Sequence, residues 1–114
     1  MNRYYFDHNA TTPIVEEVLQ VHVEALREVY GNASSIHHQG QMARQRCEHA
    51  RRQVAALIGA DAREIVFCSG GSEANNLAIF GAARGRAHVI TTAIEHPAVL
   101  QPVAQLVREG VEAT

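Results

Sequence analysis

Apolar residues in the first half of the chain recur every three or four positions, which is the spacing of one helix face. This pattern predicts a helix over about 13–30 and a second helix over about 41–58. Thr12 is expected to cap the first helix and Pro13 to open it, because these residue types suit those positions. Gly59 is expected to end the second helix, since glycine readily adopts the left-handed conformation that follows many helices.

In the second half, short continuous apolar runs alternate with helical segments. Runs with β-branched residues, bounded by turn-forming residues, predict buried strands. This alternation predicts a parallel α/β sheet with right-handed crossovers. Two complete strands are too few for a buried parallel sheet, so we expect the chain to be part of a larger domain. The predicted order is strand 65–68, helix 72–83, strand 88–92, a helix between Pro97 and Gly110, and the start of a strand at 111–114.

Composition narrows the class of protein. Of the 114 residues, 46% are hydrophobic and 19% are charged, which excludes a disordered chain. The net charge of -2 gives no sign of a nucleic-acid partner, and no apolar run approaches the roughly 20 residues of a membrane span. Two cysteines make no disulfide framework and favour the reducing cytoplasm. All ten basic residues are arginine, so this chain offers no lysine amine for a Schiff base.

The segment Ser69–Glu73 joins a predicted strand to a predicted helix and reads Ser-Gly-Gly-Ser-Glu. Free backbone N–H groups and the positive end of a helix dipole meet at such a place, which suits a phosphate. Gly70 and Gly71 let the backbone approach a ligand closely, and Ser72 offers a hydroxyl. The missing lysine excludes a Walker loop, and the glycine spacing differs from the dinucleotide fingerprint. An ordinary tight turn is the alternative interpretation.

His96 follows the next predicted strand and precedes Pro97, at the mouth of a predicted helix. Ligands of open α/β sheets bind outside the carboxyl ends of the strands. His96 and the loop at 70–72 could therefore face one ligand, where a histidine could transfer protons or stack on an aromatic ring. The alternative is a histidine that only caps the helix or lies exposed.

The other histidines and the cysteines give no convincing metal site. His37 and His38 are adjacent, and Cys47 and His49 do not share a helix face. Cys47 on an apolar helix face and Cys68 at the end of a buried strand are expected to be inert core residues. Arginines on the other face of the second helix are interpreted as a solvated surface, with an anion site as the alternative.

Four segments appear in a fixed order along the chain. They are DHNATTP at 7–13, GNASSIH at 31–37, SGGSEANNLA at 69–78 and EHPAV at 95–99. Together they resemble the N-terminal part of the cysteine desulfurases, which belong to the class V aminotransferase family and use pyridoxal 5'-phosphate. The resemblance covers essentially the whole chain and implies the aspartate-aminotransferase-like fold of type I pyridoxal-phosphate enzymes.

The resemblance also implies roles for single residues. Gly71 and Ser72 are expected to contact the cofactor phosphate. His96 is expected to stack on the pyridine ring and to assist proton transfer. The segments Asn9–Thr12 and Asn32–His37 are expected near the active-site mouth and the dimer contact of a homodimer.

The implied activity belongs to the whole parent protein. It converts L-cysteine to L-alanine and an enzyme persulfide, and it passes sulfur to an acceptor or scaffold protein for iron–sulfur clusters or thiolated cofactors. Residues 1–62 are expected to be the N-terminal arm and helices, and 63–114 the start of the cofactor-binding sheet.

In this family the lysine that binds the cofactor and the nucleophilic cysteine lie beyond this region. The 114-residue chain alone is therefore expected to be inactive. Two alternatives stay open. One is a selenocysteine lyase or another class V aminotransferase. The other is a non-catalytic truncated fragment that pairs with a full-length subunit.

Overall fold

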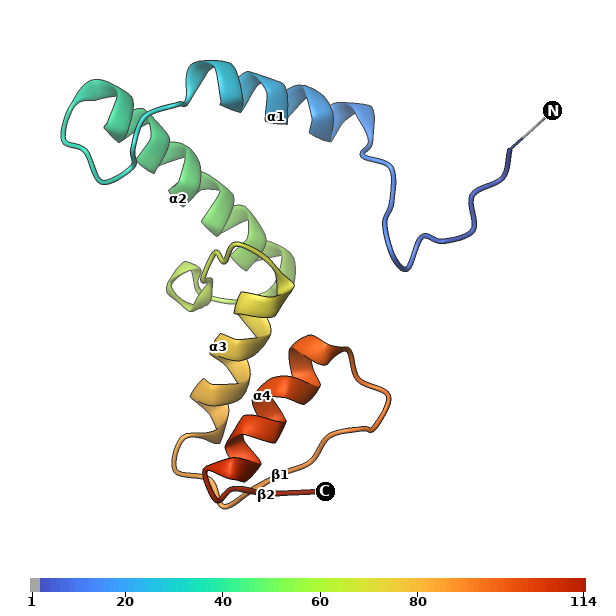
Figure 1. Cartoon of the computed structure of the whole chain (residues 1–114). Coiled ribbons are helices and arrows are strands. Elements are labelled where there is room, and N and C mark those ends of the chain that lie inside the picture. The colour runs from blue at the N-terminus through green and yellow to red at the C-terminus, as the bar shows by residue number, and fades with distance from the viewer. Residues whose placement is uncertain (1–2) are drawn as a thin grey trace. The chain divides into compact units, whose positions relative to one another are not determined.

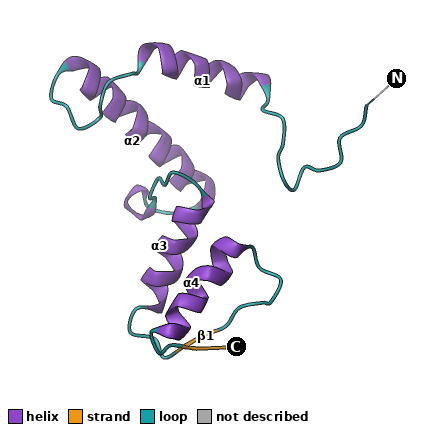
Figure 2. Ribbon diagram, in the orientation of Figure 1, coloured by secondary structure: helices purple, strands orange, loops and turns teal. Residues whose placement is uncertain are grey.

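The computed structural model describes residues 3–114. The chain divides into two compact units, one up to Ile65 and one from Val66 to Thr114, and each is described by itself. Helices make up most of the regular structure (Figure 2). No helix within residues 3–114 is long and apolar enough to cross a membrane. The elements in chain order are α1 (Glu16–Glu28), α2 (His38–Ile58), the 3-10 helix η1 (Ala62–Glu64), α3 (Gly71–Ala83), β1 (His88–Val89), α4 (Pro97–Arg108) and β2 (Glu112–Ala113) (Figure 1).

Helix α1 begins at Glu16 rather than at Pro13, so the predicted cap at Thr12 is wrong. Val15 is the N-cap residue and makes no side-chain capping bond. The Thr12 hydroxyl instead donates to the carbonyl oxygen of His8 at 3.2 Å. Threonine side chains can bond to nearby backbone groups in place of capping a helix. This local turn keeps Thr12 outside the helix.

Helix α2 begins at His38, ahead of the predicted start near residue 41. His37 caps it through Nδ1, which accepts from the backbone N–H of Gly40 at 3.3 Å. Histidine is not among the usual capping residues, which explains why the pattern places the start too late. Gly59 follows the helix with φ 70°, so the predicted glycine stop is confirmed.

The turn between α1 and α2 packs closely at two glycines. A Cβ atom on Gly31 would overlap the backbone carbonyl of Gln39, and one on Gly40 would overlap the carbonyl oxygen of Ser35. The Ser35 N–H in turn donates to the carbonyl oxygen of Asn32 at 2.9 Å. Both positions need glycine, because every other residue carries a Cβ atom.

In the second unit, β1, α4 and β2 form a strand–helix–strand unit with a parallel strand pair, which confirms the predicted parallel arrangement. His88 pairs with Glu112, and Val89 pairs with Ala113. Helix α4 begins at Pro97, as predicted. Helix α3 packs along α4 (Figure 1). The result is a helix-rich α/β arrangement with a small parallel sheet.

The predicted strand at 65–68 is not formed, so this part of the prediction is wrong. Val66 and Phe67 are 62% and 49% exposed rather than buried. A strand needs a hydrogen-bonded neighbour, and β1 and β2 pair with each other instead of with this run. Strand β1 is also shorter than the predicted 88–92, and Ile90 is exposed. The sheet of the described residues therefore has two strands where the sequence predicts three.

The interior of each unit is small. Many large apolar side chains lie exposed on the helices, for example Leu57 on α2. Cys47 is exposed as well, so its predicted place in a core is wrong, whereas Cys68 is half-buried. Uncovered apolar faces are what a part of a larger domain would present. The buried apolar residues among those described include Ala43, Ala55, Ala83, Pro102, Val103 and Leu106.

Candidate functional site

The chain enters α3 without a side-chain cap. Gly70 is the N-cap residue, with φ 169° and ψ 178°, and Gly71 is the first helical residue. The Ala74 N–H donates to the Gly70 carbonyl oxygen at 3.1 Å. The N–H groups of Gly71, Ser72 and Glu73 come before this bond, so the helix itself gives them no acceptor. They form the positive end of the helix dipole, which suits an anion.

Space around this helix start is open. A Cβ atom on Gly70 or Gly71 would meet nothing within 4 Å. Ser72 is exposed, so its hydroxyl is accessible together with the backbone donors. The free N–H donors, the helix dipole and the open space at the start of α3 therefore fit a phosphate group, which the sequence predicts for this segment.

Glu73, in the first turn of α3, bonds back to Ser69, the residue before the N-cap. Its Oε2 accepts from the backbone N–H of Ser69 at 2.6 Å and from the Ser69 hydroxyl at 2.7 Å. The backbone bond and then the hydroxyl bond hold the pKa of the Glu73 carboxyl below its ordinary value, and desolvation, which acts in the opposite direction, has a lesser effect. The sequence analysis gives Glu73 no role. The signal that could have revealed one is a serine just before the N-cap with a glutamate four residues later.

His96 is the N-cap residue of α4. Its Nδ1 accepts from the backbone N–H of Ala98 at 3.1 Å. An accepting Nδ1 carries no proton, so in the neutral ring the proton lies on Nε2. His96 is exposed, and no hydrogen bond of Nε2 is found within residues 3–114. The capping role and a chemical role therefore use different nitrogens.

The predicted site residues Gly71, Ser72 and His96 lie in the same unit, at the starts of α3 and α4. The two helices pack side by side, and Figure 1 shows them starting at the same end of the pair. Successive βα units of a parallel sheet give this arrangement. Ahead of His96, the Thr92 hydroxyl donates to Glu95 Oε1 at 3.0 Å and holds the turn.

The remaining predicted segments, Asn9–Thr12 and Asn32–His37, belong to the first unit. Cys47 lies in the first unit and Cys68 in the second. Over the described range 3–114, no group of three or more His, Cys, Asp or Glu residues is placed to hold a metal ion.

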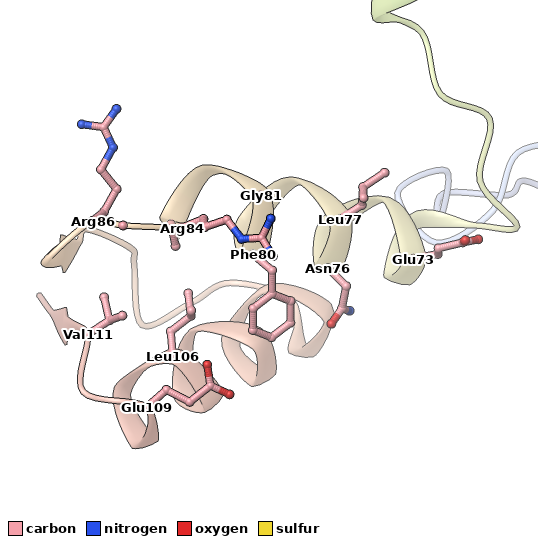
Figure 3. A pocket seen from close by; sticks show the side chains of 12 residues that line it. Glu73, Asn76, Leu77, Phe80, Gly81, Arg84, Arg86, Leu106, Glu109 and Val111 are labelled. Carbon is pink, nitrogen blue, oxygen red and sulfur yellow. The ribbon is translucent and has the colours of Figure 1, made fainter.

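A groove of about 810 Å³ runs along α3 and reaches the C-terminal half of α4. Leu77, Phe80 and Leu106 are among its apolar lining residues, and Figure 3 shows Phe80 pointing from α3 toward α4. Glu73 lines one end, but Gly71, Ser72 and His96 are not part of the lining. The groove is therefore separate from the predicted phosphate site, and the sequence gives no indication of it.

The chain belongs to the class-V aminotransferase family, whose model matches residues 4–114. It is 46% identical over 115 residues to the cysteine desulfurase IscS of Dictyoglomus turgidum. It is 51% identical over 118 residues to the cysteine desulfurase IscS of Pseudomonas fluorescens. Each match covers 96% of this chain and 29% of the relative, so the chain spans about three tenths of their length.

Solved structures show the same fold. A NifS-like protein superposes with a TM-score of 0.88 at 37% identity, over 99% of this chain and 32% of the other. A structure described as SspA in complex with cysteine superposes with a TM-score of 0.86 at 38% identity, over 96% of this chain and 33% of the other. These matches confirm the predicted type I pyridoxal-phosphate enzyme fold.

Proposed function

We propose that the chain is part of a pyridoxal-phosphate-dependent cysteine desulfurase. In this proposal the whole protein converts L-cysteine to L-alanine and keeps the sulfur as an enzyme persulfide. The names of the IscS relatives and the cysteine complex of SspA support this choice of substrate. The observation that carries the proposal is the open, uncapped start of α3 at Gly71 and Ser72.

Gly71 and Ser72 hold the phosphate of pyridoxal 5'-phosphate in this proposal. Their backbone N–H groups and the Ser72 hydroxyl donate to the phosphate oxygens, and the helix dipole stabilises the negative charge. When bound, the cofactor supplies an electron sink for the bond that breaks in the substrate.

His96 stacks on the pyridine ring and holds or moves a proton at Nε2. The cap bond to Ala98 fixes the neutral ring in the tautomer with an Nε2–H group. A general acid or base needs a nitrogen that is not used in the fold, and Nε2 meets that requirement.

Other parts of the protein supply the rest of the chemistry. This chain has no lysine to bind the cofactor, so we propose that it is inactive alone. Residues 1–62 serve as arm and helices and 63–114 as the start of the cofactor-binding sheet. The protein acts in the cytoplasm as a homodimer and passes sulfur to an acceptor or scaffold protein.

Two measurements on the protein isolated from its source test the proposal. Its intact mass, compared with 12.5 kDa, shows whether the functional protein is longer than this chain. Incubation with L-cysteine and a thiol reductant is then expected to release sulfide and L-alanine in equal amounts. Activity restricted to selenocysteine, or amino transfer to a 2-oxo acid without sulfide release, would replace this proposal with another reaction of the family.

A further inference from the structure

Ser69 and Glu73 form a small clamp across the start of α3. Both donors of Ser69, its backbone N–H and its hydroxyl, bond to the same carboxylate oxygen of Glu73, at 2.6 and 2.7 Å. The clamp encloses Gly70, Gly71 and Ser72, which contain the proposed phosphate donors. None of the roles described above uses Glu73.

The other bonds to the enclosed backbone are made to its carbonyl oxygens: Gly70 accepts from the Ala74 N–H at 3.1 Å, and Ser72 accepts from the Asn76 side-chain amide at 2.8 Å. Gly70 and Gly71 have no side chains, and nothing lies within 4 Å of where their Cβ atoms would be. Glycine backbones also lose the most conformational freedom when they are ordered. The carbonyl bonds hold the segment from the helix side, and the clamp adds the contact that ties the preceding residue, Ser69, to Glu73 in the first turn.

The clamp also keeps the Glu73 carboxylate away from the proposed phosphate donors. A carboxylate in the first turn of a helix can bond to the free N–H groups there. Here Oε2 is bonded to Ser69, on the chain before the N-cap residue. The N–H groups of Gly71 and Ser72 stay open as a result.

We propose that Glu73 is a positioning residue, which presets the segment 70–72 for a phosphate by holding Ser69. This inference rests on the proposed function, because it takes the pyridoxal 5'-phosphate group as the ligand. Glu73 does not touch the ligand. It lowers the cost of ordering the segment when the phosphate binds.

The charge of Glu73 and its bonds to Ser69 predict opposite effects on phosphate binding when Glu73 is replaced. Removing a negative charge near a phosphate would strengthen binding by relieving repulsion. Glu73 is exposed, however, and water and salt screen such a repulsion strongly. Charge-assisted bonds of 2.6 and 2.7 Å are the stronger influence, so we expect the loss to weaken binding.

The test compares two ligands on the whole protein after removal of its cofactor. Equilibrium dialysis measures the Kd of pyridoxal 5'-phosphate and of pyridoxal, which lacks the phosphate. Glu73→Ala should raise the Kd of pyridoxal 5'-phosphate about tenfold and that of pyridoxal by less than about twofold. Glu73→Gln should lie between, since one amide oxygen can still accept both bonds without the charge. Glu109→Ala, which removes an exposed carboxylate near the end of α4, is the control and should change neither Kd.

Three results would distinguish a failure of this inference from a failure of the proposed phosphate site. Equal weakening of both ligands would show a general structural role and overturn the inference. Unchanged or tighter binding of pyridoxal 5'-phosphate by Glu73→Ala and Glu73→Gln would overturn it as well. A wild-type protein that binds pyridoxal and pyridoxal 5'-phosphate equally, or neither, would instead overturn the proposed phosphate site itself.

Discussion

His96 uses its two ring nitrogens for two different purposes. Nδ1 accepts the Ala98 N–H and caps α4, which leaves Nε2 for chemistry. A helix cap and a proton-transfer role are therefore compatible in one side chain. Substitutions that separate the two nitrogens can measure each purpose by itself.

Asparagine at this position keeps the cap and removes the imidazole, because its side-chain oxygen is a good helix cap. In the whole protein we expect both His96→Asn and His96→Ala to lower kcat for L-cysteine by about 100-fold or more, the usual contribution of an acid–base group. His96→Ala should also lose about 1 kcal/mol of stability, whereas His96→Asn should not. Turnover and thermal unfolding measure the two effects. Wild-type turnover in His96→Asn would contradict the assigned role.

Glu73 gives a pH dependence with a defined sign. Its pKa in the folded chain is lowered from 4.5 by the two bonds from Ser69. The ionised form therefore stabilises the fold above pH 4.5, and this contribution is lost as the pH falls through the lower folded pKa. We expect the Tm difference between wild type and Glu73→Gln to be constant above that range and to shrink below it. A difference that grows with acidity would contradict the assigned bonds.

At the scale of elements, local patterns predict the helices well and the strand pairing incompletely. Helix α4 begins at Pro97 and helix α2 ends before Gly59, as the sequence predicts. Proline and glycine mark these boundaries because each restricts or frees its own backbone conformation, independently of distant contacts. The start of α1 is misplaced because Thr12 bonds backward to His8. The strand at 65–68 fails for another reason. Apolar character predicts burial, but a strand also needs a partner distant in sequence.

In the candidate site too, the sequence predicts the features that depend on local patterns and misses one that does not. The helix starts that carry Gly71, Ser72 and His96 can be recognised from sequence because turn and cap chemistry is local, and the roles of these residues stay predictions. The clamp between Ser69 and Glu73 depends on a side-chain rotamer, which the sequence pattern does not specify.

Two helical glycines are expected to respond in opposite directions to the same substitution. Alanine favours a helix over glycine by about 1 kcal/mol. At Gly81 in α3 a Cβ atom meets nothing within 4 Å, so Gly81→Ala should stabilise the protein. At Gly40 the Cβ atom would overlap the carbonyl oxygens of Ser35 and Asn32, and the strain of about 1–3 kcal/mol should outweigh that gain. Denaturant unfolding of both variants measures the signs, and equal signs would refute the close packing at Gly40.

At the scale of the whole molecule, exposed apolar surface is the dominant feature. Val66 and Phe67 precede the candidate phosphate site, yet they are 62% and 49% exposed. The relatives are more than three times as long as the matched segment, since it covers 29% of them. A longer protein has the chain length to cover these faces and to pair the run at 65–68 with a strand.

Hydrogen exchange can test whether that pairing forms. In the whole protein we expect the backbone amides of 65–68 to exchange as slowly as those of β1 and β2, because a central parallel strand is bonded on both sides. In the 114-residue chain alone they should exchange as fast as the loop at 92–95. Mass spectrometry of the two samples measures both segments together, with the loop as the internal standard. Fast exchange at 65–68 in the whole protein would mean that this apolar run stays a loop there, and the predicted strand would be wrong for the whole protein as well.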